Sequence, residues 1–287
     1  LDAYLKQRPK ISMGEERPLH VYLRFLRELE KELPQMAVYQ NDRKEICYED
    51  ILAVFYIQVR CFGGSFPQIR HLVIDEMQDY SRLQYLIIRR MFSCKMTILG
   101  DRAQTMADQQ QDVLQFLPGI FGKDLRRIEM RKSYRNTVEI ASYAANLIGV
   151  TDLELFERHG MPVLERDVTD LEAALREAVD TLFPEEKTYE TAAVIVPDEK
   201  TAERAYLILR EILAEKDFDC EKRLSWLNRD SSSFKKGLTV TTFYLAKGLE
   251  FDQVFSIFPK DEKREMMMQA QYIAATRALH ELRVYHI

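Results

Sequence analysis

The chain has 287 residues, of which 46% are hydrophobic and 30% are charged, and its net charge is −5. This composition is typical of a globular protein with about two domains. The four scattered cysteines form no CxxC pair, which argues against a disulfide framework or a cysteine zinc site and favours a cytoplasmic protein. We expect no membrane span, because no apolar run approaches the roughly 18 residues required. The charge balance does not support a basic nucleic-acid face, and nothing in the sequence predicts an oligomer.

Hydrophobic periodicity predicts an α/β arrangement in the first half of the chain. Two helices are expected over 19–33 and 48–61. A short apolar strand over 71–74, a helix over 83–91 and a second strand over 96–99 follow. Strand, helix and strand at this spacing favour a layered sheet covered by helices.

The second half of the chain repeats this alternation. A capping box at Thr169 and Glu172 is expected to begin a helix. The remaining expected elements are strands over 192–196, 238–241, 254–258 and 282–285, and helices over 202–213 and 263–280. Pro118, Gly119 and Gly122 interrupt the pattern, so we place a domain boundary near residue 125.

An acidic group directly follows the first expected strand. Asp75 and Glu76 begin the segment DEMQD (75–79), where a buried parallel strand would end. Hydrolysis of a nucleoside triphosphate requires Mg²⁺ on the phosphate oxygens and a group that activates the attacking water. A carboxylate pair supplies both, so we predict that Asp75 binds the metal and Glu76 acts on the water.

A polar turn follows the next expected strand. Gly100 permits a tight exit from the sheet, and the amide of Gln104 can donate a hydrogen bond to a phosphate oxygen. Taken alone, this pattern is more typical of an ordinary turn. Its position at a neighbouring strand end favours a role in the same phosphate site.

Five segments in a fixed order resemble motifs II to VI of the UvrD/Rep-type superfamily 1 DNA helicases. They are DEMQD (75–79), GDRAQ (100–104), KSYRN (132–136), AKGLEFD (246–252) and YIAATRA (272–278). Residues 244–252 are most similar to the HelD, or helicase IV-like, group. The resemblance implies an α/β fold of the RecA-like, P-loop NTPase type. Residues 1–125 would be the C-terminal part of a first RecA-like domain and 126–287 a second one, with ATP bound between them in the intact protein.

The resemblance also implies a role for each matching side chain. In the first domain, Asp75 would bind Mg²⁺, Glu76 would activate water and Gln104 would sense the γ-phosphate. In the second domain, Tyr134 would stack on adenine, Arg135 would reach the γ-phosphate and Glu250 would bind the ribose. Arg277 would be a second arginine finger. The chemistry agrees with this implied role, since a guanidinium can neutralise charge spread over equatorial phosphate oxygens.

Several departures from this family are visible, and two of them bear directly on function. It contains no Gly-x-x-x-x-Gly-Lys-Ser/Thr segment, so the phosphate-binding loop is missing and we predict a C-terminal fragment that is inactive by itself. Residues 105–110 offer no aromatic ring where relatives often stack on single-stranded bases. We therefore expect poor unwinding and only modest stimulation of hydrolysis by single-stranded DNA.

Three functions are consistent with these residues. The leading prediction is an ATP-dependent DNA helicase or translocase that acts on single-stranded or duplex DNA. The alternative is a HelD-like ATPase that binds and remodels RNA polymerase. A degenerate module that does not hydrolyse ATP is the third, and the intact set of Asp75, Glu76, Gln104, Arg135 and Arg277 argues against it.

Overall fold

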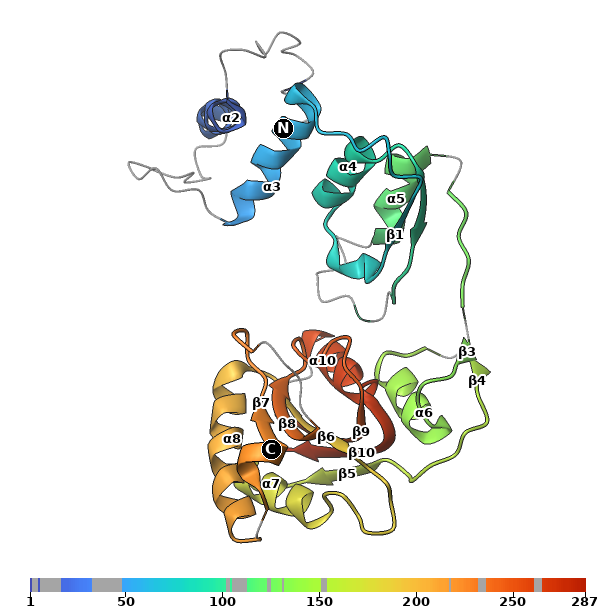
Figure 1. Cartoon of the computed structure of the whole chain (residues 1–287), viewed down its shortest axis with the longest axis vertical. Helices are drawn as coiled ribbons and strands as arrows, with labels where there is room; N and C mark the ends of the chain where they lie inside the picture. The colour runs from blue at the N-terminus through green and yellow to red at the C-terminus, as the bar shows by residue number, and fades with distance from the viewer. Residues whose placement is uncertain are drawn as a thin grey trace. The chain divides into compact units, whose positions relative to one another are not determined.

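The protein is described by a computed structural model that divides into two compact units (Figure 1). The structure describes residues 1, 5, 17–32, 48–101, 104, 113–122, 125–130, 132–150, 154–216, 218–231, 236–260 and 265–287. Unit 1 comprises Leu1–Arg127 and unit 2 comprises Ile128–Ile287, a division close to the boundary expected at residue 125. Within the described residues, no helix is both long and apolar enough to cross a membrane.

Two helices at the beginning of unit 1 pack against each other. They are α2 (Pro18–Glu32) and α3 (Tyr48–Ile57), and both lie where the hydrophobic periodicity predicted helices. Their shared core includes Val21, Tyr56 and Ile57, which are at most 1% exposed. The second helix continues as a π-helical turn, η1 (Gln58–Phe62), which ends at Gly63. The expected stop is confirmed, because the φ of 92° at Gly63 cannot continue a helix.

Unit 1 also contains the expected strand, helix and strand. β1 (His71–Ile74) pairs in parallel with β2 (Lys95–Ile98), and α4 (Arg82–Met91) connects them. A further helix, α5 (Val113–Phe121), contains Pro118, one of the residues taken to interrupt the pattern. This helix buries Val113 and Leu117 against Tyr85 and Ile74. The free energy of this burial offsets the cost of the internal proline.

Unit 2 is built on a six-stranded, all-parallel sheet with the strand order β5-β10-β9-β6-β8-β7. The strands are β5 (Leu164–Asp167), β6 (Thr191–Val196), β7 (Leu224–Trp226), β8 (Gly237–Thr242), β9 (Phe251–Phe258) and β10 (Ala278–His286). The expected α/β class, with parallel strands flanked by helices, is confirmed. A separate pair of short strands, β3 (Lys132–Ser133) and β4 (Glu154–Leu155), lies at the beginning of the unit.

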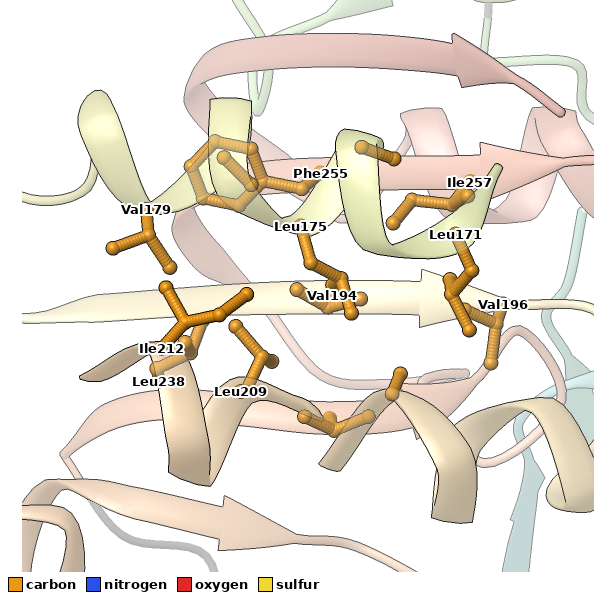
Figure 2. Packing of buried hydrophobic residues seen from close by; sticks show 14 of the residues in the cluster. Leu171, Leu175, Val179, Val194, Val196, Leu209, Ile212, Leu238, Phe255 and Ile257 are labelled. Carbon is orange, nitrogen blue, oxygen red and sulfur yellow. The ribbon is translucent and has the colours of Figure 1, made fainter. Parts of the chain in front are cut away.

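Helices cover both faces of the large sheet. Alternate residues of a strand point to opposite faces, and the two cores of unit 2 follow this rule. Val194 and Val196 of β6 pack against residues of α7 (Leu171–Asp180) and α8 (Glu199–Ala214), as Figure 2 shows. Ala193 and Ile195 instead pack with residues of α6 (Val138–Leu147) and α10 (Glu265–Ala275). The remaining helix, α9 (Cys220–Arg223), directly precedes β7.

Two expectations about element ends were wrong. Asp170, not Thr169, caps α7, because its carboxylate accepts the hydrogen bond from Ala173 N. The expected helix over 263–280 is described only from Glu265, and it ends at Ala275. Residues 278–281 belong instead to β10, because pairing with β9 begins at Ala278.

Candidate functional site

The predicted catalytic residues of unit 1 lie at the carboxyl ends of β1 and β2. Because these strands are adjacent and parallel, they end at the same edge of the sheet. Two backbone hydrogen bonds join the chain segments there: Leu99 N donates to Ile74 O, and Met77 N donates to Leu99 O, each at 2.8 Å. The segments that carry Asp75 and Gln104 therefore leave the sheet side by side.

The backbone turns sharply at Glu76. This residue has a φ of 52° and a ψ of 50°, a left-handed conformation that costs a residue with a side chain about 1–2 kcal/mol. Asp75 Oδ1 accepts a hydrogen bond from Glu76 N at 2.8 Å, and Tyr85 Oη donates to Met77 O at 3.1 Å. Burial raises the pKa of the Tyr85 phenol, which keeps it a hydrogen-bond donor. Unusual backbone of this kind is concentrated at functional sites.

A chain of side-chain hydrogen bonds brings Glu76 and Gln104 into one group. Gln78 Nε2 donates to Glu76 Oε2 at 2.5 Å, and Gln78 Oε1 accepts from Asp101 N at 3.1 Å. Asp101 Oδ2 in turn accepts from Gln104 Nε2 at 3.0 Å. Gln78 and Gln104 are buried, whereas Asp75 is exposed beside them. Gln78 was not assigned a role from the sequence, although it lies inside the DEMQD segment.

The remaining predicted site residues form a second group, in unit 2. Arg135 follows β3, Glu250 directly precedes β9 and Arg277 directly precedes β10. Arg135 Nε lies 2.8 Å from Glu250 Oε1, and both side chains are nearly half exposed. Ala278 of β10 pairs with Phe251 of β9. Glu250 and Arg277 each come one residue earlier, so they directly precede the paired starts of two neighbouring strands.

Arg277 is 1% exposed, which differs from the surface position expected of an arginine finger. Its Nε donates to Ile273 O at 3.2 Å, and its Nη2 donates to Thr276 Oγ1 at 3.1 Å. A longer bond of 3.4 Å runs from Nη1 to Leu249 O, next to Glu250. The guanidinium is therefore held within unit 2 in this conformation.

Tyr134, the predicted adenine-stacking residue, presents its ring to solvent. The side chain is 61% exposed, and its ring centroid lies 5.6 Å from that of Phe156 at an angle of 37°. Lys132 Nζ lies 5.5 Å from the centroid of Tyr134 and 5.9 Å from that of Phe156. These distances allow a cation–π contact on two aromatic rings at once.

Two further side chains hold the segment that carries Arg135. Asn136 Nδ2 donates to Thr276 O at 3.2 Å and to Ala278 O at 2.6 Å, on either side of Arg277. Arg158 Nη2 donates to Arg135 O and, at 2.7 Å, to Leu279 O. Asn136 could have been inferred from its place in the KSYRN segment. Arg158 lies in no motif, and no sequence signal indicated its role.

The predicted magnesium site rests on few protein ligands. Among the residues that the structure describes, no three His, Cys, Asp or Glu side chains cluster as a metal site. Mg²⁺ in phosphoryl-transfer sites commonly uses one or two carboxylates together with phosphate oxygens and water. An exposed carboxylate such as that of Asp75 fits this kind of ligation.

Comparison with known proteins gives only distant similarities. No family model and no curated protein matches the chain. The C-terminal domain of a possible DNA helicase from Lactobacillus plantarum WCFS1 is 23% identical, with a TM-score of 0.40 over 54% of this chain and 88% of that chain. Arterivirus nonstructural protein 10, a helicase solved with DNA, is 14% identical, with a TM-score of 0.44 over 77% and 40%. The PRRSV helicase is 17% identical, with a TM-score of 0.42 over 78% and 36%. The chain therefore spans well under two thirds of these two viral helicases, and values this low assign neither a family nor a function.

Proposed function

We propose that this chain supplies catalytic and nucleotide-sensing groups of an ATP-driven helicase or translocase that moves on DNA. The motifs favour the UvrD/Rep type of superfamily 1, with both units belonging to RecA-like domains. One observation carries the proposal: hydrogen bonds join Glu76 to Gln104 through Gln78 and Asp101, at the ends of two adjacent parallel strands. A carboxylate and an amide held together at such an edge suit the attack of water on a phosphoryl group.

In unit 1, each side chain would perform one part of this reaction. Asp75 would be a ligand of Mg²⁺, which neutralises charge on the phosphate oxygens when it is bound. Glu76 would accept a proton from the attacking water or orient that water. Gln104 would donate its amide hydrogen to a phosphate oxygen, in exchange for its present bond to Asp101.

In unit 2, the exposed groups would recognise the nucleotide. Tyr134, which is 61% exposed, would stack its ring on a base. Arg135 would exchange Glu250 for a phosphate oxygen, which would leave the Glu250 carboxylate to accept from a ribose hydroxyl. The Arg135–Glu250 ion pair is well exposed, so this exchange costs little free energy.

Arg277 would stabilise the transition state only after a local rearrangement. Its bond to Leu249 O is the longest of its three described hydrogen bonds and the first that we expect to break. Arginine fingers in phosphoryl transfer contribute roughly 10³- to 10⁵-fold to the rate. Arg277→Ala should therefore slow hydrolysis far more than it weakens nucleotide binding.

The proposal of DNA as partner rests on the motifs alone. Residues 105–110, which govern the expectation of poor unwinding, lie outside the described residues. That expectation remains a prediction. In the part of the chain that the structure describes, no feature favours the RNA polymerase alternative.

The proposal is tested by measuring phosphate release from ATP by the 287-residue chain and by the full-length protein. The 287-residue chain should hydrolyse ATP negligibly, because it contains no phosphate-binding loop. The full-length protein should hydrolyse ATP in the presence of Mg²⁺, and Glu76→Gln should reduce its turnover by at least 100-fold, at the low end of roughly 10²–10⁴-fold for general base catalysis. Glu172→Gln, an exposed carboxylate on α7, is the matched control and should have no effect. Robust turnover by the 287-residue chain, or normal turnover by the Glu76→Gln protein, would show that the assignment is wrong.

A further inference from the structure

Gln78 has no role in the reaction proposed above, yet both ends of its amide are engaged. The side chain is 7% exposed, and it bonds Glu76 from one side and the backbone of Asp101 from the other. We infer that Gln78 is a positioning residue that orients the Glu76 carboxylate and couples it to the Gln104 segment. This inference rests on the proposed function, because it assigns a partner to the proposed catalytic carboxylate.

The amide of Gln78 can take only one orientation in this setting. A carboxylate such as Glu76 accepts hydrogen bonds, so it requires the NH₂ group of the amide. The N–H of Asp101 donates, so it requires the amide oxygen. Rotating the amide by half a turn would lose both bonds and bury unsatisfied groups. The orientation of Gln78 is therefore fixed by its partners on two different segments.

Glu76 needs such a partner more than an ordinary surface carboxylate does. Its backbone is left-handed, so neighbouring groups must hold it in that conformation. The adjoining turn is packed tightly: a Cβ added at Gly100 would lie 2.6 Å from Met77 N and would also meet Gln78 Oε1. Gly100 therefore allows the Asp101 segment to approach Gln78 closely enough for the hydrogen bond to form.

The result is a relay of side chains that runs from Glu76 through Gln78 and Asp101 to Gln104. Gln104 Nε2 and Gln104 N both donate to Asp101, at 3.0 Å and 3.1 Å. When Gln104 turns towards a phosphate, Asp101 loses one of these bonds. Its backbone can then shift against the rigid amide of Gln78. The relay thus links the presence of a γ-phosphate to the position of the water-activating carboxylate.

Two substitutions of Gln78 in the full-length protein distinguish the contributions of its two hydrogen bonds, one to Glu76 and one to Asp101. Gln78→Met preserves the length of the side chain and removes both bonds. Gln78→Glu retains an acceptor for Asp101 N but replaces the donor that faces Glu76. We expect both variants to lose at least tenfold in kcat, with KM for ATP within twofold of the wild-type value. Gln58→Met, a glutamine of the same unit outside the relay, is the control and should hydrolyse normally.

A second readout does not depend on hydrolysis. In the 287-residue chain labelled with ¹⁵N-glutamine, the side-chain resonances of Gln78 should move on Glu76→Gln and on Gln104→Ala. They should not move on Glu172→Gln. A response to Glu76→Gln with none to Gln104→Ala would refute the coupling to the Gln104 segment.

The outcomes distinguish this inference from the proposed function. If Glu76→Gln abolishes hydrolysis while both Gln78 variants retain kcat within twofold, the proposed function stands and the inference is wrong. If Gln78→Glu alone keeps the wild-type kcat, the bond to Glu76 is irrelevant and Gln78 serves only the turn. If Glu76→Gln itself hydrolyses normally, the proposed function fails first.

Discussion

The two groups of predicted site residues differ in their position on the strands and in the groups that hold them. In unit 1 they follow the carboxyl ends of β1 and β2, and side chains bond to one another there, as Gln104 does to Asp101. In unit 2, Tyr134 and Arg135 follow the short strand β3, whereas Glu250 and Arg277 precede β9 and β10, at the amino ends of these strands. There, backbone carbonyls accept from Asn136, Arg158 and Arg277.

This difference predicts how closely function and stability are coupled in each unit. Side chains that bond mainly to one another can be replaced with little damage to the fold. Side chains that satisfy backbone groups near the core of a sheet cannot, because buried partners remain without hydrogen bonds. We therefore expect substitutions in the second group to affect stability as well as activity.

Arg277→Ala should produce the largest effect on stability. It removes a buried guanidinium with three described hydrogen bonds, so unit 2 should lose about 3 kcal/mol of unfolding free energy. Urea unfolding followed by the fluorescence of Trp226, the only tryptophan and part of unit 2, measures this loss.

A substitution in the site of unit 1 is the control for Arg277→Ala. Asp75→Asn, at the exposed end of β1, should change the unfolding free energy of unit 1 by less than about 0.5 kcal/mol, measured by circular dichroism because Trp226 belongs to unit 2. An Arg277→Ala protein that unfolds at the wild-type urea concentration would show that the guanidinium is not held within unit 2 in solution.

A medium effect is expected at Glu139, in the first turn of α6. Burial raises the pKa of its carboxyl, but hydrogen bonds from its own N–H, His159, Gly160 N and Thr137 together lower the pKa to about 2. The folded state thus favours the ionised form, which stabilises unit 2 above the unfolded pKa of about 4.5. This contribution is lost as the pH falls from about 4.5 towards 2.

Glu139→Gln should therefore cost about 1 kcal/mol at neutral pH, after allowance for solvent screening of this partly exposed side chain. The difference from the wild type should shrink as the pH falls below about 4.5, as measured by urea unfolding at a series of pH values. A difference that stays constant down to pH 3 would contradict the lowered pKa.

The smallest effect should come from the Arg135–Glu250 pair. Because both side chains are nearly half exposed, a double-mutant cycle should give a coupling of about 0.2–1 kcal/mol that decreases in high salt. Arg166 and Glu177, exposed and 3.1 Å apart, form a matched control pair with the same expected range. A coupling above about 2 kcal/mol would show that the pair is structural and would count against its exchange for a nucleotide.

The sequence predicted the elements that have strong apolar patterns. β6 and β9 are buried runs of apolar residues, and the strand before Asp75 ends where the acidic segment indicated. β5 was missed because its residues Leu-Glu-Arg-Asp are all exposed and carry no alternating pattern. β7 has only three residues, which is too short for periodicity to detect.

The candidate site was predictable only as a set of residue types. The resemblance selected Glu76 and Gln104, and the structure brings them into one hydrogen-bonded group. The resemblance could not indicate that Arg277 is buried. Its burial depends on the packing of α10 against β10 and on the carbonyl of Leu249, which comes from a distant segment. Arg158 was missed for the same reason, since its partners Arg135 and Leu279 are far apart in the sequence.

The position of β10 has a consequence for the order in which unit 2 folds. β5 precedes every other strand of the large sheet in the sequence, yet its described partner is β10, which follows them all. As the ribosome extends the chain, β5 must wait unpaired until residues such as Arg283, opposite Leu164, have been synthesised. Such long-range pairing slows folding and prolongs the exposure of strand edges. Nascent chains that stop before β10 should therefore depend most strongly on chaperones.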